Sequence, residues 1–326
     1  MSDQMVSLVL SCPELQVWPE LEKILTKRKQ GTISLCNIAY TTTGNSNIEL
    51  LPIQAAILCF VVESILIDDV LDKDEKGMWK EIGVDKIVNL VGALHARQQL
   101  LICESKFSDH QKQQVTLFLN QMMLVLANVQ ELATHSKIDL ARYWKIVHGK
   151  SGNVCGTAMR IGALLGEVHQ DESDILYSIG KCMGEIGQIS NDLRGAFQKE
   201  VNPDWKMPGS SLPILLALTT EHEYSAELKK LLEKDLGQIK QLERAKDILI
   251  KSGAVSLCCD HISQRLELLY QEICKCNLPQ KKHLHKNIGE DIQNAIRWVK
   301  KLDIELSEKT QRNLAELEAK IESLLS

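Results

Sequence analysis

The stretch that decides the fold reads LPIQAAILCFVV at residues 51–62 and continues to IDDVLD at residues 67–72. Apolar side chains occupy nearly every position of its first part, and this pattern predicts a helix that is buried on all sides. The helix delivers Asp68 and Asp72 four residues apart, hence on one helix face, where two like charges cost about 0.2–0.5 kcal/mol. A hard divalent cation between the carboxylates removes that cost, so the spacing indicates a metal site.

The same aspartates have a simpler interpretation as an exposed helix end. Asp68, Asp69, Asp72 and Asp74 would then lead into a solvated turn at residues 72–76, because runs of charge usually lie at the surface. Carboxylates delivered by a buried helix, in contrast, must be paired, protonated or bound to metal. The motif alone leaves both interpretations open.

The rest of the chain predicts an all-α protein. Apolar residues recur at spacings of three and four, and no segment alternates with period two. The 18 glycines and 7 prolines form no linker. We therefore expect one helical domain over residues 1–285, with residues 286–326 as a C-terminal helical extension packed on it. The long segments with helical spacing are 86–103, 111–134, 138–167, 173–199, 211–219, 225–252 and 254–275.

Composition excludes several classes of function. The net charge is −5 with acidic and basic residues interspersed, so the chain lacks the basic patch of a nucleic-acid-binding protein. Its 10 cysteines show no paired metal-ligand spacing and are expected to be reduced thiols. No uninterrupted apolar run reaches the roughly 18–20 residues that cross a bilayer. We expect a cytoplasmic protein without a transmembrane segment.

Four further segments follow the aspartates in a fixed order. They are residues 143–152 with Lys150, residues 184–192 with Gln188 and Asn191-Asp192, residues 210–218 with Ser-Leu-Pro, and residues 245–273 around Ser252-Gly253-Ala254. This ordered set, over residues 20–275, resembles the trans-prenyl diphosphate synthase superfamily with its class I isoprenoid synthase fold. The resemblance implies a single antiparallel helical bundle around a central cavity.

The resemblance also implies a chemistry. Members of this superfamily ionise an allylic prenyl diphosphate, here expected in the geranyl to geranylgeranyl range, with Mg²⁺ as cofactor. Because the leaving diphosphate carries a dense negative charge, metal ions and basic side chains must neutralise it. The implied metal ligands are Asp68, Asp69, Asp72, Asn191 and Asp192. The implied catalytic residues are Asp68, Asp72 and Lys150, and the implied substrate-binding residues are Lys150, Gln188, Arg194 and Lys29.

The chain departs from the chain-elongating members where they bind isopentenyl diphosphate. Residues 28–33 read Arg-Lys-Gln-Gly-Thr-Ile in place of a Gly-Gly-Lys-Arg segment, and residues 73–80 hold lysines in place of an Arg-Arg pair. Lysine cannot copy the bidentate binding of phosphate by arginine. We therefore expect transfer of the prenyl group to an acceptor other than isopentenyl diphosphate, as in the ComQ-type enzymes that prenylate a tryptophan of a peptide.

Three alternatives stay open. The second motif also resembles that of terpene synthases, which cyclise the cation without an acceptor, although Gly195 and Lys199 replace a hydroxyl residue and a glutamate of that motif. The other two alternatives are a chain-elongating polyprenyl diphosphate synthase and the silent regulatory subunit of one.

The resemblance further implies a homodimer, since relatives of this fold mostly pair. Residues 111–134 and 138–167 carry more apolar surface than one metal cavity can cover. Soluble monomers avoid an exposed apolar patch of that size. We expect the contact at residues 86–101 and 115–132.

Overall fold

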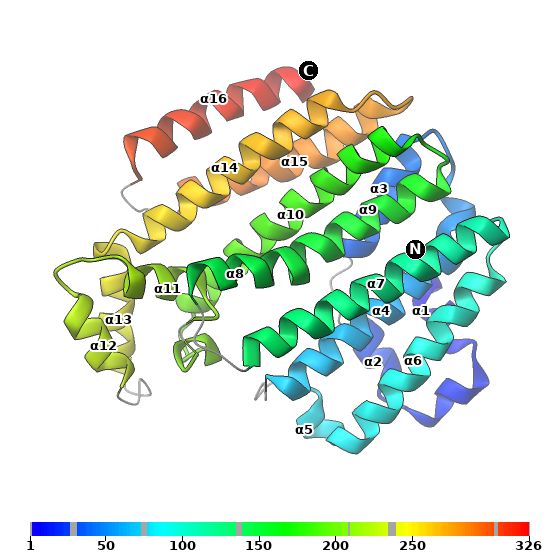
Figure 1. Ribbon diagram of the computed structural model, residues 1–326, viewed down its shortest axis with the longest axis horizontal. Coiled ribbons are helices and arrows are strands. Elements are labelled where there is room, and N and C mark those ends of the chain that lie inside the picture. The colour runs from blue at the N-terminus through cyan, green and yellow to red at the C-terminus, as the bar shows by residue number, and fades with distance from the viewer. Residues whose placement is uncertain are drawn as a thin grey trace. The chain divides into compact units, whose positions relative to one another are not determined.

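The computed structural model describes residues 2–26, 31–72, 77–134, 139–207, 209–233, 239–302 and 306–325. Every regular element in these ranges is a helix, which confirms the predicted all-α class (Figure 1). The chain divides into two compact units. Unit 1 comprises Met1–Gln130, Asn153–Gly180 and Cys276–His283, and unit 2 comprises Glu131–Gly152, Lys181–Lys275 and Leu284–Ser326. The predicted extension from residue 286 stays a prediction.

Unit 1 is built around α4, Leu51–Leu71. Pro52 stands in the first turn of this helix, where its missing N–H costs nothing. Every residue from position 53 to position 60 is buried, which confirms the predicted core helix. Helix α6 (Val84–Glu104) packs along α4 most extensively, and α1 (Ser2–Leu10) and α3 (Gly31–Thr42) also contact it. The remaining elements are η1 (Pro13–Val17), α2 (Leu21–Thr26), η2 (Asn47–Leu50), α5 (Trp79–Ile82), α7 (Asp109–Thr134) as far as Gln130, α9 (Asn153–Leu165) and the first part of α10 (Gln170–Ala196).

Helices α3 and α9 approach each other closely at a glycine. A Cβ atom on Gly162 of α9 would lie 2.2 Å from the carbonyl oxygen of Cys36 and 2.8 Å from the Cβ of Ala39, both on α3. Side chains do not tolerate such distances to backbone, so only glycine permits this crossing.

We expect the substitution Gly162→Ala to lower the free energy of unfolding by about 1–3 kcal/mol, because the added methyl group must push the two backbones apart. Gly187→Ala is the matched control, since no atom lies within 4 Å of the Cβ it would add to α10. That variant should gain about 0.5–1 kcal/mol from the better helix former. Urea denaturation of both measures the contrast, and equal effects would contradict the close crossing.

Unit 2 is organised around α14, Ala254–Lys275. It contacts α11 (Leu212–Thr219), α13 (Ile239–Lys251) and α16 (Glu308–Leu325), and Figure 1 shows α16 lying alongside it. Leu314, Leu317 and Ile321 of α16 are buried, so this charged C-terminal helix belongs to the core of unit 2. The remaining elements are α8 (Leu140–Val147), η3 (His148–Gly152), the second part of α10, η4 (Pro203–Trp205), α12 (Ser225–Leu232) and, from Leu284 onward, α15 (Lys281–Lys300).

Two helices among the described residues have the length and apolar composition of a membrane-crossing segment, namely α4 and the part Asp109–Ala133 of α7. The most apolar window of α4 is 61% buried, as befits a core helix, whereas that of α7 is only 28% buried. Helix α7 leaves large apolar side chains exposed, including Leu117 and Leu124.

Candidate active site

The first aspartate motif lies at the C-terminal end of α4, in unit 1. The backbone N–H of Asp72 donates to the carbonyl oxygen of Asp68 at 2.8 Å, so the two residues stand one helical turn apart, as their spacing predicts. Asp68 and Asp69 are half-buried and Asp72 is exposed, whereas Asp74 lies outside the described residues. The motif therefore begins at the edge of the core and ends at the surface.

Gln130 of α7 orients Asp72, and the motif itself does not reveal this. Its side-chain Nε2 donates to Asp72 Oδ1 at 2.7 Å, and Gln130 is only 4% exposed. The hydrogen bond holds one carboxylate oxygen of Asp72 in a defined position. The sign of this contact in the sequence is that Gln130 is polar within the apolar pattern of α7. Its partner Asp72 is 58 residues away in the chain, so the sequence does not show the pairing.

The residues present fit a magnesium ion that takes most of its ligands from phosphate and water. Mg²⁺ is usually held by one or two carboxylates together with substrate phosphates. Within the described ranges, no group of three or more histidine, cysteine, aspartate or glutamate side chains is arranged to hold a metal by itself. Metal binding by Asp68 and Asp72 stays a prediction.

Glu63 lies ahead of the aspartates on α4 and points toward α6. It is 3% exposed, and its Oε1 lies 3.2 Å from Nδ1 of His95. Its Oε2 is buried without a hydrogen-bond partner in the described structure. Burial raises the pKa of Glu63 to about 7, although His95 opposes the shift.

This raised pKa predicts a pH dependence of stability. Folding favours the protonated form of Glu63, so its contribution is complete below about pH 4.5, the ordinary pKa, and is lost as the pH rises through about 7. Glu63→Gln cannot titrate. The free energy of unfolding of the wild type minus that of the variant should fall between these pH values in urea denaturation. A difference that does not change with pH would contradict the assignment.

The second motif lies on α10, in unit 2, and Asp192 is its buried member at 4% exposure. Oδ2 of Asp192 accepts hydrogen bonds from the hydroxyl of Tyr143 at 2.5 Å and from the backbone N–H of Leu212 at 3.0 Å. Oδ1 accepts from Nε2 of Gln188 at 2.8 Å. Burial raises the pKa of Asp192 to about 6, although these hydrogen bonds oppose the shift. Asp192 thereby ties α8 and the start of α11 to α10.

Asn191 and Arg194 lie on the exposed side of α10. Nη1 of Arg194 donates to Oδ1 of Asn191 at 3.4 Å, and the guanidinium lies 5.4 Å from the ring centroid of Trp298. Asn191 offers an oxygen to a cation, and Arg194 offers a phosphate-binding fork. Metal binding by Asp192 stays a prediction, because the three donors leave about one of the four lone-pair positions of its carboxylate for a cation.

Lys150 lies in the π-helical turn His148–Gly152 that follows α8. The neighbouring Ser151 donates from Oγ to Oε1 of Gln188 at 2.8 Å, so this turn and the second motif meet within unit 2. Lys150 itself is half-buried. Lys29, the remaining predicted substrate-binding residue, lies outside the described residues.

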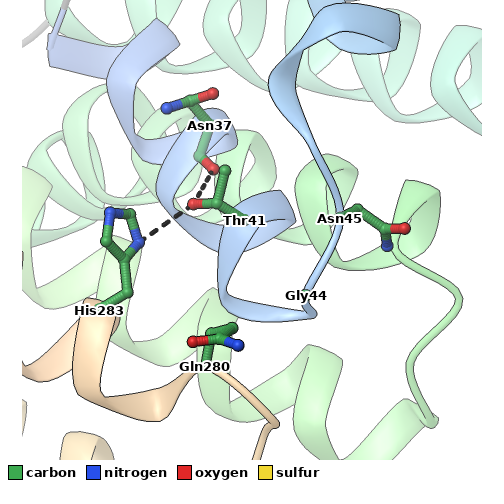
Figure 2. Close-up of a pocket in the computed structure, with 6 residues that line it drawn as sticks. All are labelled: Asn37, Thr41, Gly44, Asn45, Gln280 and His283. Atoms are coloured by element: carbon green, nitrogen blue, oxygen red, sulfur yellow. Dashed lines mark hydrogen bonds between the residues drawn. The ribbon is translucent and has the colours of Figure 1, made fainter.

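Each unit contains a cavity. The one drawn in Figure 2 lies in unit 1, has a volume of about 330 Å³ and includes none of the predicted site residues. Asn37, Thr41, Gly44, Asn45, Gln280 and His283 line it. The other, of about 480 Å³, lies in unit 2 and is bordered by Asn191 and Arg194, with Leu266, Leu269 and Trp298 among its apolar walls. The second motif therefore borders a cavity of the size that small ligands occupy.

The sequence of this chain is similar to those of known proteins. The model of the polyprenyl synthetase family matches residues 25–249. The nonaprenyl diphosphate synthase of Mycobacterium tuberculosis (strain ATCC 25618 / H37Rv) is 25% identical over 150 residues, which are 43% of this chain and 44% of that protein. The chain thus aligns with less than half of the length of this relative.

Solved structures confirm the predicted fold. A crystal structure of a geranylgeranyl pyrophosphate synthase matches with a TM-score of 0.79 and 17% identity, over 91% of this chain and 95% of that one. The geranylgeranyl pyrophosphate synthase from Corynebacterium glutamicum, complexed with calcium and isoprenyl diphosphate, matches with a TM-score of 0.74 and 16% identity, over 92% and 93% of the two chains.

Proposed function

The chain belongs to the polyprenyl synthetase family, since residues 25–249 are more than half of its length, and we propose that it is a chain-elongating prenyltransferase. Such an enzyme joins the allylic group of a prenyl diphosphate to isopentenyl diphosphate and releases diphosphate. The observation that carries the proposal is the pair Asp68 and Asp72, one turn apart at the end of the core helix and inside the family match.

This proposal takes the place of the peptide acceptor expected from the sequence. The relatives described above are named as nonaprenyl and geranylgeranyl diphosphate synthases, so the chain-elongating alternative has the better support. Transfer to another acceptor is the second candidate. One observation favours it, namely that residues 28–33 and 73–80 lack the Gly-Gly-Lys-Arg and Arg-Arg sequences of chain-elongating members.

In the proposed reaction the side chains of this protein bind and orient the diphosphate. Asp68 and Asp72 would hold Mg²⁺, and Gln130 would keep Asp72 in position. When bound, the ion stabilises the charge that develops on the leaving diphosphate. In unit 2, taken by itself, Lys150 and Arg194 are the side chains that the resemblance to the superfamily proposes for phosphate binding. The Corynebacterium structure, complexed with calcium and isoprenyl diphosphate, supports the binding of a divalent ion and of such a substrate.

Product analysis tests the function. The purified protein is incubated with Mg²⁺ and geranyl, farnesyl or geranylgeranyl diphosphate, with and without isopentenyl diphosphate. We expect prenyl diphosphates longer than the donor only when isopentenyl diphosphate is present. A cyclised product from the donor alone would identify a terpene synthase, and no consumption of any donor would support the silent-subunit alternative.

Variants of the first motif link that activity to the site. Asp68→Ala and Asp72→Ala should each lower turnover by about 10²-fold or more, the scale seen when one charge-stabilising group is removed. Asp171→Ala removes an exposed carboxylate from the first turn of α10 and serves as the control. Wild-type turnover in both motif variants would contradict the assignment of these aspartates.

Exposed apolar side chains on α6 and on α7 support the proposed homodimer. Val88 and Leu100 of α6 are 65% and 50% exposed, and Leu124 of α7 is 71% exposed. These residues fall in the segments expected to form the contact. Burial of each such side chain against a second copy is favourable by less than the roughly 1.5–3 kcal/mol of a fully exposed one, and closed two-fold pairing is the commonest oligomeric arrangement.

Light scattering tests the pairing. The wild type should have about twice the single-chain mass of 36.7 kDa. Leu124→Glu should shift the mass toward the single chain, because a carboxylate would be buried in the contact. Ile239→Glu replaces a similarly exposed residue of α13 and should leave the mass unchanged. A wild-type mass near that of one chain would contradict the homodimer.

A further inference from the structure

The π-helical turn that carries Lys150 is held at two points on one face of α10. Ser151 bonds to Gln188, and Nδ1 of His148 lies 2.6 Å from Oε1 of Glu185. Glu185 and Gln188 are three residues apart and therefore neighbours on that helix face. A π-turn lacks the regular hydrogen-bond pattern of an α-helix and often occurs at functional sites, so its shape depends on such contacts.

Glu185 is a buried carboxylate with both oxygens engaged. Its side chain is 7% exposed, and its Oε2 accepts a hydrogen bond from Nε of Arg265 at 2.8 Å. Burial alone would raise the pKa of Glu185, but the hydrogen bond from His148 and the charges of His148 and Arg265 lower it. The carboxylate therefore remains ionised and acts as a fixed acceptor for the turn.

Arg265 connects this carboxylate back to the helix that leads into the turn. Its guanidinium lies 4.0 Å from the ring centroid of Trp144, and the Trp144 and His148 rings are stacked with centroids 6.0 Å apart. The side chain of Arg265 is only 12% exposed, which makes this cation–π contact stronger than one at the surface. Trp144, His148, Glu185 and Arg265 thus form one closed cluster across α8, η3, α10 and α14, which we call the turn clamp.

Gly152, the last residue of the π-turn, also lies against Glu185. A Cβ atom on Gly152 would lie 3.2 Å from Cγ of Lys181 and 3.3 Å from Cγ and Oε1 of Glu185. The backbone of the turn therefore lies directly against the part of α10 that carries Glu185. Removing the carboxylate would leave the turn without its closest polar partner.

We propose that Glu185, with Arg265 and His148, is a positioning residue that holds the π-turn in the shape in which Lys150 binds the substrate diphosphate. The proposal rests on the proposed function and adds residues that the sequence motifs do not contain. A misplacement of about 1 Å in a binding group can cost about 10²-fold in rate, so the turn clamp has a large effect without touching the substrate.

Binding of a non-hydrolysable farnesyl thiodiphosphate with Mg²⁺, measured by calorimetry, tests the proposal. Glu185→Gln and His148→Leu should each weaken binding by about tenfold or more, on the scale that loss of a partner of the coordinating residues has at metal sites. His148→Asn should bind close to the wild type, because the asparagine amide nitrogen can take the place of Nδ1. The imidazole is 43% exposed, so neither substitution at this position opens a hole in the core. Glu227→Gln breaks the exposed pair with Arg244 in the same unit and is the control.

A double-mutant cycle separates positioning from a general loss of structure. If Glu185 acts through Lys150, Glu185→Gln should have little further effect in a Lys150→Ala background, whereas independent residues give additive losses. Hydrogen exchange should also show faster exchange of the turn in His148→Leu than in His148→Asn, without any substrate. Additive losses, or wild-type affinity in Glu185→Gln, would overturn the proposal while leaving the proposed function intact. Failure of the wild type to bind would instead refute the proposed function, and this inference with it.

Discussion

The packing of one almost wholly apolar helix, α4, is the interaction on which unit 1 depends. Its residues 53–60 are buried without a break, so neighbouring helices must cover it on every side. Such a helix has no polar face that sets its rotation about its own axis. The shapes of the neighbouring helices therefore determine its orientation. Its polar contacts are few: Gln54 donates to Asn37 and Glu63 meets His95 within the helix, and Gln130 meets Asp72 at its end. The packing of this core helix therefore determines where the carboxylates of Asp68 and Asp72 lie.

Unit 2 places its polar groups differently. Asp192 lies in its interior and joins three segments through hydrogen bonds from Tyr143, Leu212 and Gln188. A buried carboxylate is expensive unless its oxygens are paired, and three donors meet that requirement. These hydrogen bonds hold the Asp192 side chain in one position, whereas the neighbouring Asn191 is exposed.

The helical class, and which residues of each motif share a helix face, could be predicted because both depend on the spacing of residues close together in the sequence. Asp68 and Asp72 share a helix face, and Gln188 stands one turn before Asp192, whatever the rest of the chain does. The partners could not be predicted in this way. Tyr143 and Asp192 are 49 residues apart, and Arg265 and Glu185 are 80 residues apart. Pairing across such distances is decided by how helices pack, which a single sequence does not encode as a repeating pattern.

The crossing of α3 and α9 has a consequence for how this sequence can vary. Gly162 leaves no room beside the carbonyl oxygen of Cys36 and the methyl group of Ala39. Because the obstacle includes a main-chain atom, no smaller residue on α3 can make space for a side chain at position 162. Substitution is therefore possible on one side of the crossing only. Ala39 can be replaced by glycine, whereas any replacement of Gly162 requires the two helices to move apart.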